Sequence, residues 1–451
     1  MLFFFVIKEK RTKHICNVFL PMSNKTCLEN LPDEILLLIC RYLSSCEVLY
    51  SFFELNHRLS QTVNGYYRHV VIERVSYKYF PSICSIILPS IGFHIRSLIL
   101  SDQWKGTLSS LFLNYFSQQQ INSICPNLKD LTCIAFTDFS LQNLLNSLRN
   151  FHDFHQIKIH RSYAYPSKSI QSEDLLNDIF TTNNNRLNSI LFDDESIVFS
   201  FENLHRIYSN INELSIDLKT IDDLHRLLTI LPRLTSLSVG INENPSQNPS
   251  QNSLENSTEP IESLKIFRLQ SFGPYWTFAQ LVSVIKRMLN VEELSISLET
   301  NEDLQFVDKQ HVLSLISNLS LRKFHYLIRC YYSRKQSIDC QEILSNWKDF
   351  QREIVCFQIK EQQTLVFYSL PICFPYLILP IEVVQNQEHF TCQVKFLTLK
   401  TRTNDFNETF RCITKCRLLE NLNLRITQDV TSSKRTFFNR ENHQTSCFLF
   451  R

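Results

Sequence analysis

The sequence predicts an α/β protein in which a small N-terminal helical module precedes an irregular solenoid of strand-helix units with a parallel sheet. Three observations predict this architecture: a helical stretch with a marked start near residue 31, an apolar strand pattern that recurs from Ile95 to Ile426, and helical periods between its copies. The expected parts are a loosely ordered extension at 1–27, the helical module at 28–75, the solenoid at 76–427 and a C-terminal tail at 428–451.

Composition and charge restrict the possible classes of function. The 451 residues are 44% apolar and 20% charged, which is ordinary for a globular protein. Lys and Arg total 46 against 44 acidic residues, so the net charge of +2 gives no field that would attract nucleic acid or an anionic membrane. We therefore expect neither nucleic acid nor a membrane as a partner.

Glycine is scarce, which argues against phosphate-binding loops. The glycines lie too far apart for a dinucleotide fingerprint, a P-loop or a nucleophile elbow. They are Gly65, Gly92, Gly106, Gly240 and Gly273. We expect no cofactor.

The 15 cysteines are predicted to be reduced. Their number is odd, the chain is long, and no Cys-x-x-Cys pair occurs. Cys412 and Cys416 have a spacing that suits one helix face, but no second Cys or His pair lies near them to complete a zinc site. The cysteines are therefore interpreted as small apolar core residues.

The first residues are apolar but do not form an export signal. Met1–Ile7 is followed, rather than preceded, by basic residues, and seven residues are too few to span a bilayer. Met22 lies just before the helical module and is an alternative start. A cytoplasmic or nuclear location is expected.

The helical module is predicted from residues 28–59. Pro32, Asp33 and Glu34 favour a helix start, because proline suits the first turn and carboxylates suit the positive end of the helix dipole. A second helical run begins near Glu47. One apolar stripe on the first helix contains Leu31, Ile35, Leu36, Ile39, Tyr42 and Leu43. A unit of about forty residues is marginal alone, so the stripe is expected to dock on another surface.

This stretch resembles the F-box. The resemblance covers Leu31–Leu36, Tyr42-Leu43 and Glu47–Leu49, with Arg58 at one of the family's basic positions and Leu59 where the family has Trp. It implies docking on a Skp-family adaptor and, through it, on a cullin. By position in the motif, the implied adaptor-binding residues are Leu31, Pro32, Ile35, Leu36, Ile39 and Leu43.

The strand pattern has two positions between its first two apolar residues and one before its third. Its eleven copies are Ile95/Leu98/Leu100, Leu128/Leu131/Cys133, Phe154/Ile157/Ile159, Leu187/Ile190/Phe192, Ile211/Leu214/Ile216, Leu234/Leu237/Val239, Ile261/Leu264/Ile266, Val291/Leu294/Ile296, Leu321/Phe324/Tyr326, Val394/Leu397/Leu399 and Leu419/Leu422/Leu424. Helical periods lie between copies, with caps predicted at Thr107, Ser140, Thr220 and Thr277. Stacked units of this kind bury faces that one unit cannot bury alone.

The array resembles the leucine-rich repeat from Ile95 to Ile426. The family's ladder asparagine occurs only at Asn242, and early copies are spaced by 23 to 33 residues, so the repeats are expected to be irregular. Two interruptions are predicted. Residues 242–260 contain a tandem Asn-Pro-Ser-Gln repeat and are expected to be a disordered loop, whereas 330–392 form an irregular insert, either a hairpin or degraded repeats.

No catalytic or metal site emerges from spacing. His152, His155 and His160 form the densest histidine cluster, but residues three apart on a strand face opposite sides. The acidic runs 193–195 and 222–223 suit a strand end and a helix start. The concave sheet face is the expected surface for a target protein, and its candidate binding residues are His160, Asp217, Lys265, Phe267, His325, Lys400 and Arg425.

Together the two resemblances imply a substrate-recognition subunit of a cullin-RING (SCF-type) ubiquitin ligase. The helical module would bind the adaptor, the array would hold a target protein, and catalysis would come from partners rather than from this chain. One alternative is an interaction scaffold that recruits no ligase. The other is an unrecognised hydrolase, because sequence spacing does not exclude convergence of distant residues in space.

Overall fold

The computed structural model divides the chain into two compact units, residues 1–257 and 258–451. It describes residues 31–73, 75–102, 108–115, 120–148, 151–160, 172–192, 198–201, 206–242, 260–333, 338–350, 354–359, 363–370, 376–380, 396–401, 421–426 and 447–449. The extension at 1–27, the loop interior at 243–259 and nearly all of the tail at 428–451 lie outside these ranges.

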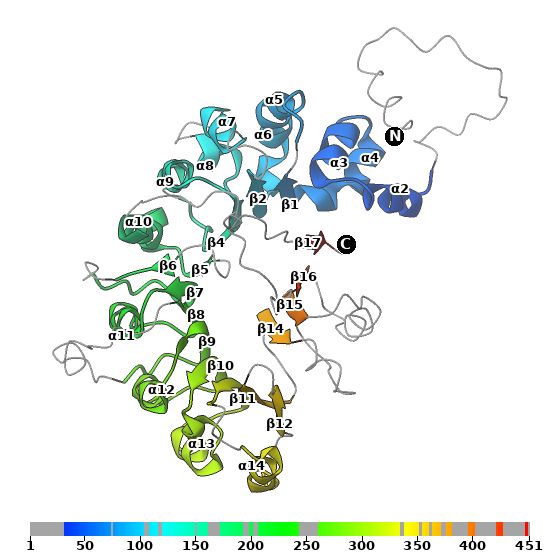
Figure 1. Cartoon of the computed structure of the whole chain (residues 1–451). Helices are drawn as coiled ribbons and strands as arrows, with labels where there is room; N and C mark the ends of the chain where they lie inside the picture. Colours follow the sequence, from blue (N-terminus) through cyan, green and yellow to red (C-terminus); the bar gives the residue numbers. More distant parts are fainter. Residues whose placement is uncertain are drawn as a thin grey trace, which may run out of the picture. The chain divides into compact units, whose positions relative to one another are not determined.

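The first unit begins with short helices (Figure 1). They are α2 (Asp33–Cys40), α3 (Ser45–Phe52), α4 (His57–Thr62) and the 3₁₀ turn η2 (Asn64–Tyr67). Pro32 is the N-cap of α2, and Asp33 and Glu34 occupy its first turn, as predicted. Ser44 and Glu47 form a reciprocal capping box at the start of α3, and the Asn56 side chain accepts a hydrogen bond from the Leu59 N–H.

The sheet of the first unit is parallel. Its strands follow one another in chain order: β1 (His69–Ile72), β2 (Ser97–Ser101), β3 (Asp130–Ile134), β4 (Gln156–His160), β5 (Ser189–Phe192), β7 (Glu213–Leu218) and β8 (Ser236–Ile241). The short β6 (Val198–Phe199) pairs with β7. Successive copies of the apolar pattern align in register, so that Leu98, Leu131, Ile157, Ile190, Leu214 and Leu237 form one buried row.

Helical segments connect these strands and lie together on one side of them (Figure 1). They are α5 (Phe80–Ser82), the π turn η3 (Ile83–Ile87), α6 (Leu88–Ile91), η4 (Gly92–His94), α7 (Leu108–Tyr115), α8 (Gln120–Ile124), α9 (Asp138–Ser147), α10 (Ser172–Asn185) and α11 (Ile221–Ile230). Thr220 caps α11 through a capping box with Asp223, as predicted, whereas the cap of α9 is Thr137, which accepts from the Ser140 N–H.

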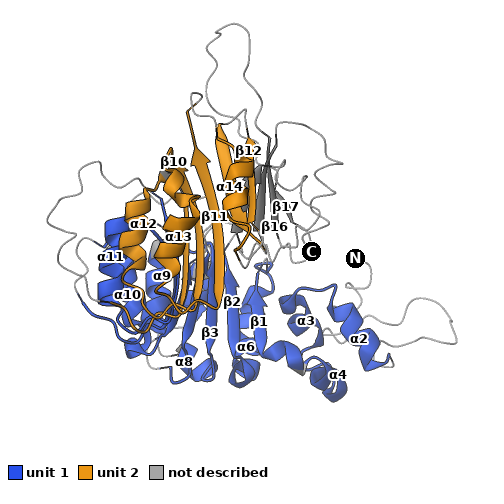
Figure 2. Cartoon of the chain, turned by 90° about the horizontal axis from the view of Figure 1, so that it is seen from below, with its two compact units in different colours: residues 1–257 blue, residues 258–451 orange. Residues whose placement is uncertain are grey.

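The second unit contains a mixed sheet, which is orange in Figure 2, and a further small sheet. Strands β9 (Ile266–Tyr275), β10 (Glu293–Asn301) and β11 (Lys323–Tyr331) are parallel. β13 (Thr364–Ser369) pairs antiparallel with β11 and forms a hairpin with β12 (Ile354–Ile359). The smaller sheet has β14 (Tyr376–Pro380), β15 (Phe396–Thr401) and β16 (Asn421–Ile426) in parallel and β17 (Cys447–Leu449) antiparallel. The helical segments are α12 (Phe278–Ile285), η5 (Leu304–Phe306), α13 (Lys309–Ile316) and α14 (Cys340–Asn346).

These elements confirm the α/β class and a large, mostly parallel arrangement of strands. The structure adds a copy of the pattern that the sequence analysis did not count: Val70 and Ile72 on β1 align with Leu98 and Leu100. Residues 69–72 therefore form a strand inside the range expected for the helical module. Of the alternatives for 330–392, residues 354–369 form the hairpin, whereas β14 pairs in parallel with β15.

One copy of the pattern was assigned to the wrong residues. The pattern predicted Ile261/Leu264/Ile266, but Phe267 and Leu269 are the partners of Leu294 and Ile296, so the copy is Leu264/Phe267/Leu269. Two overlapping matches to the same pattern lie three residues apart here. A shift by an odd number of residues exchanges the two faces of a strand, so Phe267 is fully buried rather than facing outward.

Two glycines provide a matched test of backbone packing. A Cβ on Gly92 would lie 1.9 Å from the Ile124 carbonyl oxygen, whereas a Cβ on Gly65 would meet no atom within 4 Å. We predict that Gly92→Ala lowers the free energy of unfolding by about 1–3 kcal/mol, because backbone must move to relieve the overlap. Gly65→Ala should change it by less than about 0.5 kcal/mol. Denaturant unfolding of both variants measures the difference, and equal midpoints would contradict the close approach of α8 to Gly92.

Candidate protein-docking site

Helix α2 is apolar on both of its sides. Leu36 and Cys40 are each only 1% exposed, and α2 packs against α4. Ile35, Leu38 and Tyr42 are 42%, 46% and 84% exposed. At about 100° per residue, Ile35, Leu38 and the half-buried Ile39 fall within one sector of roughly 100°, and Tyr42 lies in the turn that follows α2. We call Ile35, Leu38, Ile39 and Tyr42 the outer face of α2, which is an apolar surface without a partner in the described chain.

The start of α2 is held by Arg58 of α4. The Arg58 guanidinium donates to Asp33 Oδ1, with Nη2 at 2.6 Å and Nε at 3.0 Å, and Nη2 also donates to the Leu31 carbonyl oxygen at 2.5 Å. The Arg58 and Asp33 side chains are 45% and 52% exposed, so this ion pair contributes at most about 1 kcal/mol. Its effect is to fix the orientation of α2, whose stability comes from the buried side.

Helix α3 attaches this helical module to the sheet of the first unit. The Val71 N–H of β1 donates to Ser45 Oγ at 3.4 Å, and the Cys46 thiol donates to the Val71 carbonyl oxygen at 2.9 Å. β1 is the first strand in the order, so these bonds satisfy backbone groups on its outer edge. The module therefore covers a sheet edge with α3 and leaves the outer face of α2 open.

The predicted adaptor-binding residues divide into two groups. Pro32 and Ile35 are exposed, and Leu31, Ile39 and Leu43 are partly exposed. Leu36 is 1% exposed and packs inside the module. Leu38, which was not predicted, lies on the outer face instead. The apolar run from Ile35 to Ile39 is continuous, so only the position of α4 decides which side turns inward.

The predicted concave-face residues do not form one exposed patch. Asp217 and His325 are 8% and 7% exposed, and Phe267 belongs to the core. Lys265 lies before β9 with its Nζ 3.3 Å from Glu292 Oε1, and His160 ends β4 partly exposed. Lys400 and Arg425 are register partners on β15 and β16, but their side chains lie outside the description.

The side chains of His152 and His155 contact different partners and do not converge. His152 Nδ1 lies 3.2 Å from Arg186 Nη1, while His155 lies 2.8 Å from the Asp153 carbonyl oxygen and 3.7 Å from Asp130. No group of three or more His, Cys, Asp or Glu side chains that suits a metal ion occurs within the described ranges.

The described cysteines match the prediction of buried free thiols. All eight are free, and all except the partly exposed Cys340 are buried. Burial raises the pKa of Cys46, Cys84 and Cys125 to about 12, so these thiols stay protonated at neutral pH.

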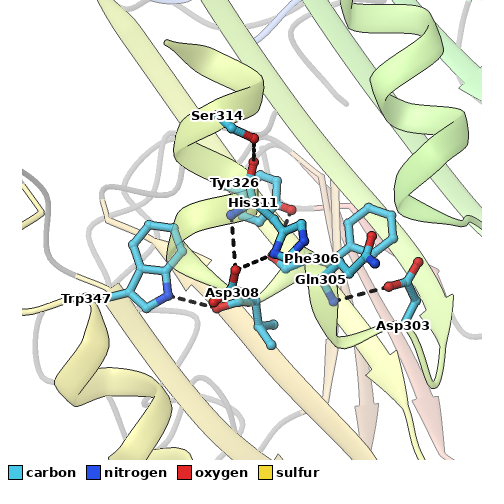
Figure 3. A network of polar contacts seen from close by, with 9 residues as sticks. Asp303, Gln305, Phe306, Asp308, His311, Ser314, Tyr326 and Trp347 are labelled. Atoms are coloured by element: carbon cyan, nitrogen blue, oxygen red, sulfur yellow. Dashed lines mark hydrogen bonds and ion pairs between the residues drawn. The ribbon is translucent and has the colours of Figure 1, made fainter.

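A cluster of Asp, His and Ser at α13 has the composition of a catalytic triad but a different geometry (Figure 3). Asp308 is the N-cap of α13 and accepts from both the backbone N–H and the ring of His311. Ser314 Oγ donates to the His311 backbone carbonyl at 2.7 Å, not to the imidazole. Burial alone would raise the Asp308 pKa, but the His311 contacts outweigh it, and the pKa lies below its ordinary value. The cluster caps a helix.

The segment before α13 is held by hydrogen bonds to side chains of β11 and of the residue after α14. Tyr326 OH donates to the Phe306 carbonyl oxygen at 2.9 Å, and Trp347 Nε1 donates to the Val307 carbonyl oxygen at 2.9 Å (Figure 3). Asp303 accepts from the Gln305 and Phe278 backbone N–H groups at 3.1 and 2.8 Å. The bonds from Tyr326 and Trp347 satisfy buried carbonyl groups of the turn before α13, and Asp303 also binds the first N–H of α12.

A buried ion pair lies on neighbouring strands of the second unit. Arg329 Nη1 donates to Glu299 Oε1 at 2.9 Å, with side-chain exposures of 6% and 9%. Burial lowers the Arg329 pKa, and Glu299 and Tyr331 oppose that shift. Burial and then the Glu299 charge raise the Tyr331 pKa to about 12. Glu299 and Arg329 occupy equivalent positions, five residues after Leu294 and Phe324. Aligning these two copies of the strand pattern in the sequence would have predicted the ion pair.

No family model matches this chain, and a search of curated proteins finds no significant match. Among the helices in the described ranges, none has the length and apolar character needed to cross a bilayer.

The two sides of α2 should respond oppositely to substitution. We predict that Leu36→Ala lowers the free energy of unfolding of the module by about 2–5 kcal/mol, because it opens a cavity. Leu38→Glu should cost clearly less, at most about 1.5 kcal/mol, because Leu38 is 46% exposed and removing it opens no cavity. Hydrogen exchange at α3 amides under increasing denaturant measures both, and a large loss in Leu38→Glu would show that the outer face is packed.

Replacing one partner of the Glu299–Arg329 ion pair should lower the free energy of unfolding more than replacing both partners. We predict that Arg329→Met lowers the free energy of unfolding by about 3–5 kcal/mol, because Glu299 is left buried without its partner. The double variant Glu299→Leu with Arg329→Met should recover most of that loss. Denaturant unfolding of the two single variants and the double variant completes the cycle, and additive losses would contradict direct coupling.

Proposed function

We propose that this chain is the substrate-recognition subunit of an SCF-type cullin-RING ubiquitin ligase. The observation that carries the proposal is the outer face of α2. The exposed or partly exposed Leu31, Pro32, Ile35, Ile39 and Leu43 belong to the stretch that resembles the F-box. After its acidic first turn α2 has only apolar residues, and such a sequence normally lies inside a protein, so its open side fits the role of a docking surface for a Skp-family adaptor.

Leu59 bears on the departure from the F-box pattern. This residue, where the family has Trp, is 1% exposed in α4. A buried leucine fills an apolar site in the module, so the substitution leaves the adaptor-facing side of α2 unaffected. The proposal accordingly assigns adaptor binding to α2 and module packing to α4.

The strand-helix array, which resembles irregular leucine-rich repeats, is proposed to hold the target protein. In the first unit, burial alternates along most of the strands, leaving a partly exposed row that contains Thr132, Lys158, Ser215 and Ser238. In β10 and β11 of the second unit nearly every residue is buried on both faces. The target surface is therefore proposed on β2–β8, and catalysis is proposed to come from the ubiquitin-loaded partner through proximity.

Adaptor binding tests the proposal directly. We predict that the full chain copurifies with a Skp-family adaptor and a cullin, and that Ile35→Asp with Leu38→Asp weakens adaptor binding by about 30-fold or more, because charges replace the centre of an apolar contact. Ile86→Asp is the matched control, since Ile86 is 48% exposed on η3, away from α2. Binding affinity is measured by calorimetry with purified adaptor.

Two outcomes would overturn the ligase proposal. A wild-type chain that binds neither adaptor nor cullin would leave the interaction-scaffold alternative. Equal loss of binding in the Ile86→Asp control would show a general effect of added charge rather than docking through α2. Folding of each variant is checked by hydrogen exchange at α3.

A further inference from the structure

The outer face of α2 has no partner among the described residues, and Tyr42 in it is 84% exposed. The sequence before α2 contains a run of six consecutive large apolar residues, Leu2–Ile7. Apolar groups of this size are costly to leave in water.

We propose that the segment Leu2–Ile7 docks on the outer face of α2 and occupies it when no other protein does. The docking itself is independent of the ligase proposal. Its consequence, competition between the segment and the adaptor for one surface, rests on that proposed function.

The chain length between the two features permits this contact. Residues 8–32 separate Ile7 from the first residue of α2, Asp33. A random coil of this length would span about 25–30 Å on average, whereas α2 with its 8 residues is about 12 Å long. The tethered segment is thus present at an effective concentration of order millimolar, so a weak apolar contact suffices to keep the face occupied.

Charge complementarity sets the direction of the segment. Lys8, Lys10 and Arg11 directly follow Ile7, and the exposed Glu34 lies in the first turn of α2 beside Asp33, which pairs with Arg58. Basic residues beside that turn place the preceding apolar residues toward Leu38 and Tyr42. The segment therefore runs antiparallel to α2, the direction that a chain turning back onto its own helix also favours.

A second apolar run makes a sharp control possible. Val18-Phe19-Leu20 also precedes α2 but is shorter, is followed by Pro21, and has no basic cluster directly after it. Phe3→Asp with Phe5→Asp removes the proposed contact, whereas Phe19→Asp changes the other run and leaves Leu2–Ile7 intact. All three positions precede the described residues, and denaturant unfolding of each variant checks that the described core is unchanged.

Hydrogen exchange at the amides of α2 tests the docking in the full chain without any partner. If the segment occupies the face nine-tenths of the time, Phe3→Asp with Phe5→Asp should speed exchange at residues 36–42 about tenfold, and Phe19→Asp should leave it unchanged. A chain beginning at Met22 should exchange like the double variant, and a synthetic peptide of residues 1–13 should restore protection to it. Equal exchange in wild type and double variant, or an equal effect of Phe19→Asp, would overturn the proposal.

Adaptor affinity separates this inference from the ligase proposal. At nine-tenths occupancy, release of the segment should strengthen adaptor binding about tenfold, because the competent fraction of the chain rises by that factor. Faster α2 exchange with no adaptor binding in any variant would support the docking and sink the ligase proposal. Equally strong adaptor binding in the wild type and the double variant, with unchanged α2 exchange, would support the ligase proposal and overturn the docking of Leu2–Ile7.

Discussion

The register of one buried apolar row is the constraint on which the first unit depends. Val70, Leu98, Leu131, Ile157, Ile190, Leu214 and Leu237 are direct partners along seven parallel strands, and none is more than 2% exposed. Each strand buries this row against helices on one side, and burying such a side chain contributes about 1.5–3 kcal/mol. Connections of different length are tolerated because only the strands must align. The uneven spacing of the copies is therefore compatible with a regular sheet.

The position of α2 follows from this sheet. A parallel sheet leaves an open edge at its first strand, and the backbone groups there need partners. Ser45 and Cys46 of α3 supply them to Val71, which fixes α3, and Arg58 of α4 fixes the start of α2. The helical module thus covers the edge of the sheet with α3, while α2 packs against the described residues by one side only. The surface that we propose for docking is a consequence of edge protection by the neighbouring helix.

The sequence predicted the strands that repeat along the chain. It did not show which face of β9 or which side of α2 is buried. The strand pattern located β2–β5, β7 and β8 with their partners, because each copy must match its neighbours. At Phe267 two overlapping matches differed by three residues, and the choice exchanged core and surface. At Leu36 the apolar run was continuous, so no periodicity marked the inner side. The pairing of Glu299 with Arg329 depends on residues 30 positions apart, and only the alignment of β10 with β11 brings them together.

The stability of the fold does not explain why the outer face of α2 is apolar. Replacing Leu38 by a charged residue would cost the isolated chain little, so the fold alone does not require an apolar side chain there. Leu36 differs, because its neighbours within the module require it. A large apolar side chain at an exposed position raises the risk of aggregation unless a partner covers it for most of the time. A tethered apolar segment of the same chain meets that need whenever an external partner is absent, and it can be displaced because the contact is weak and is maintained by its high local concentration.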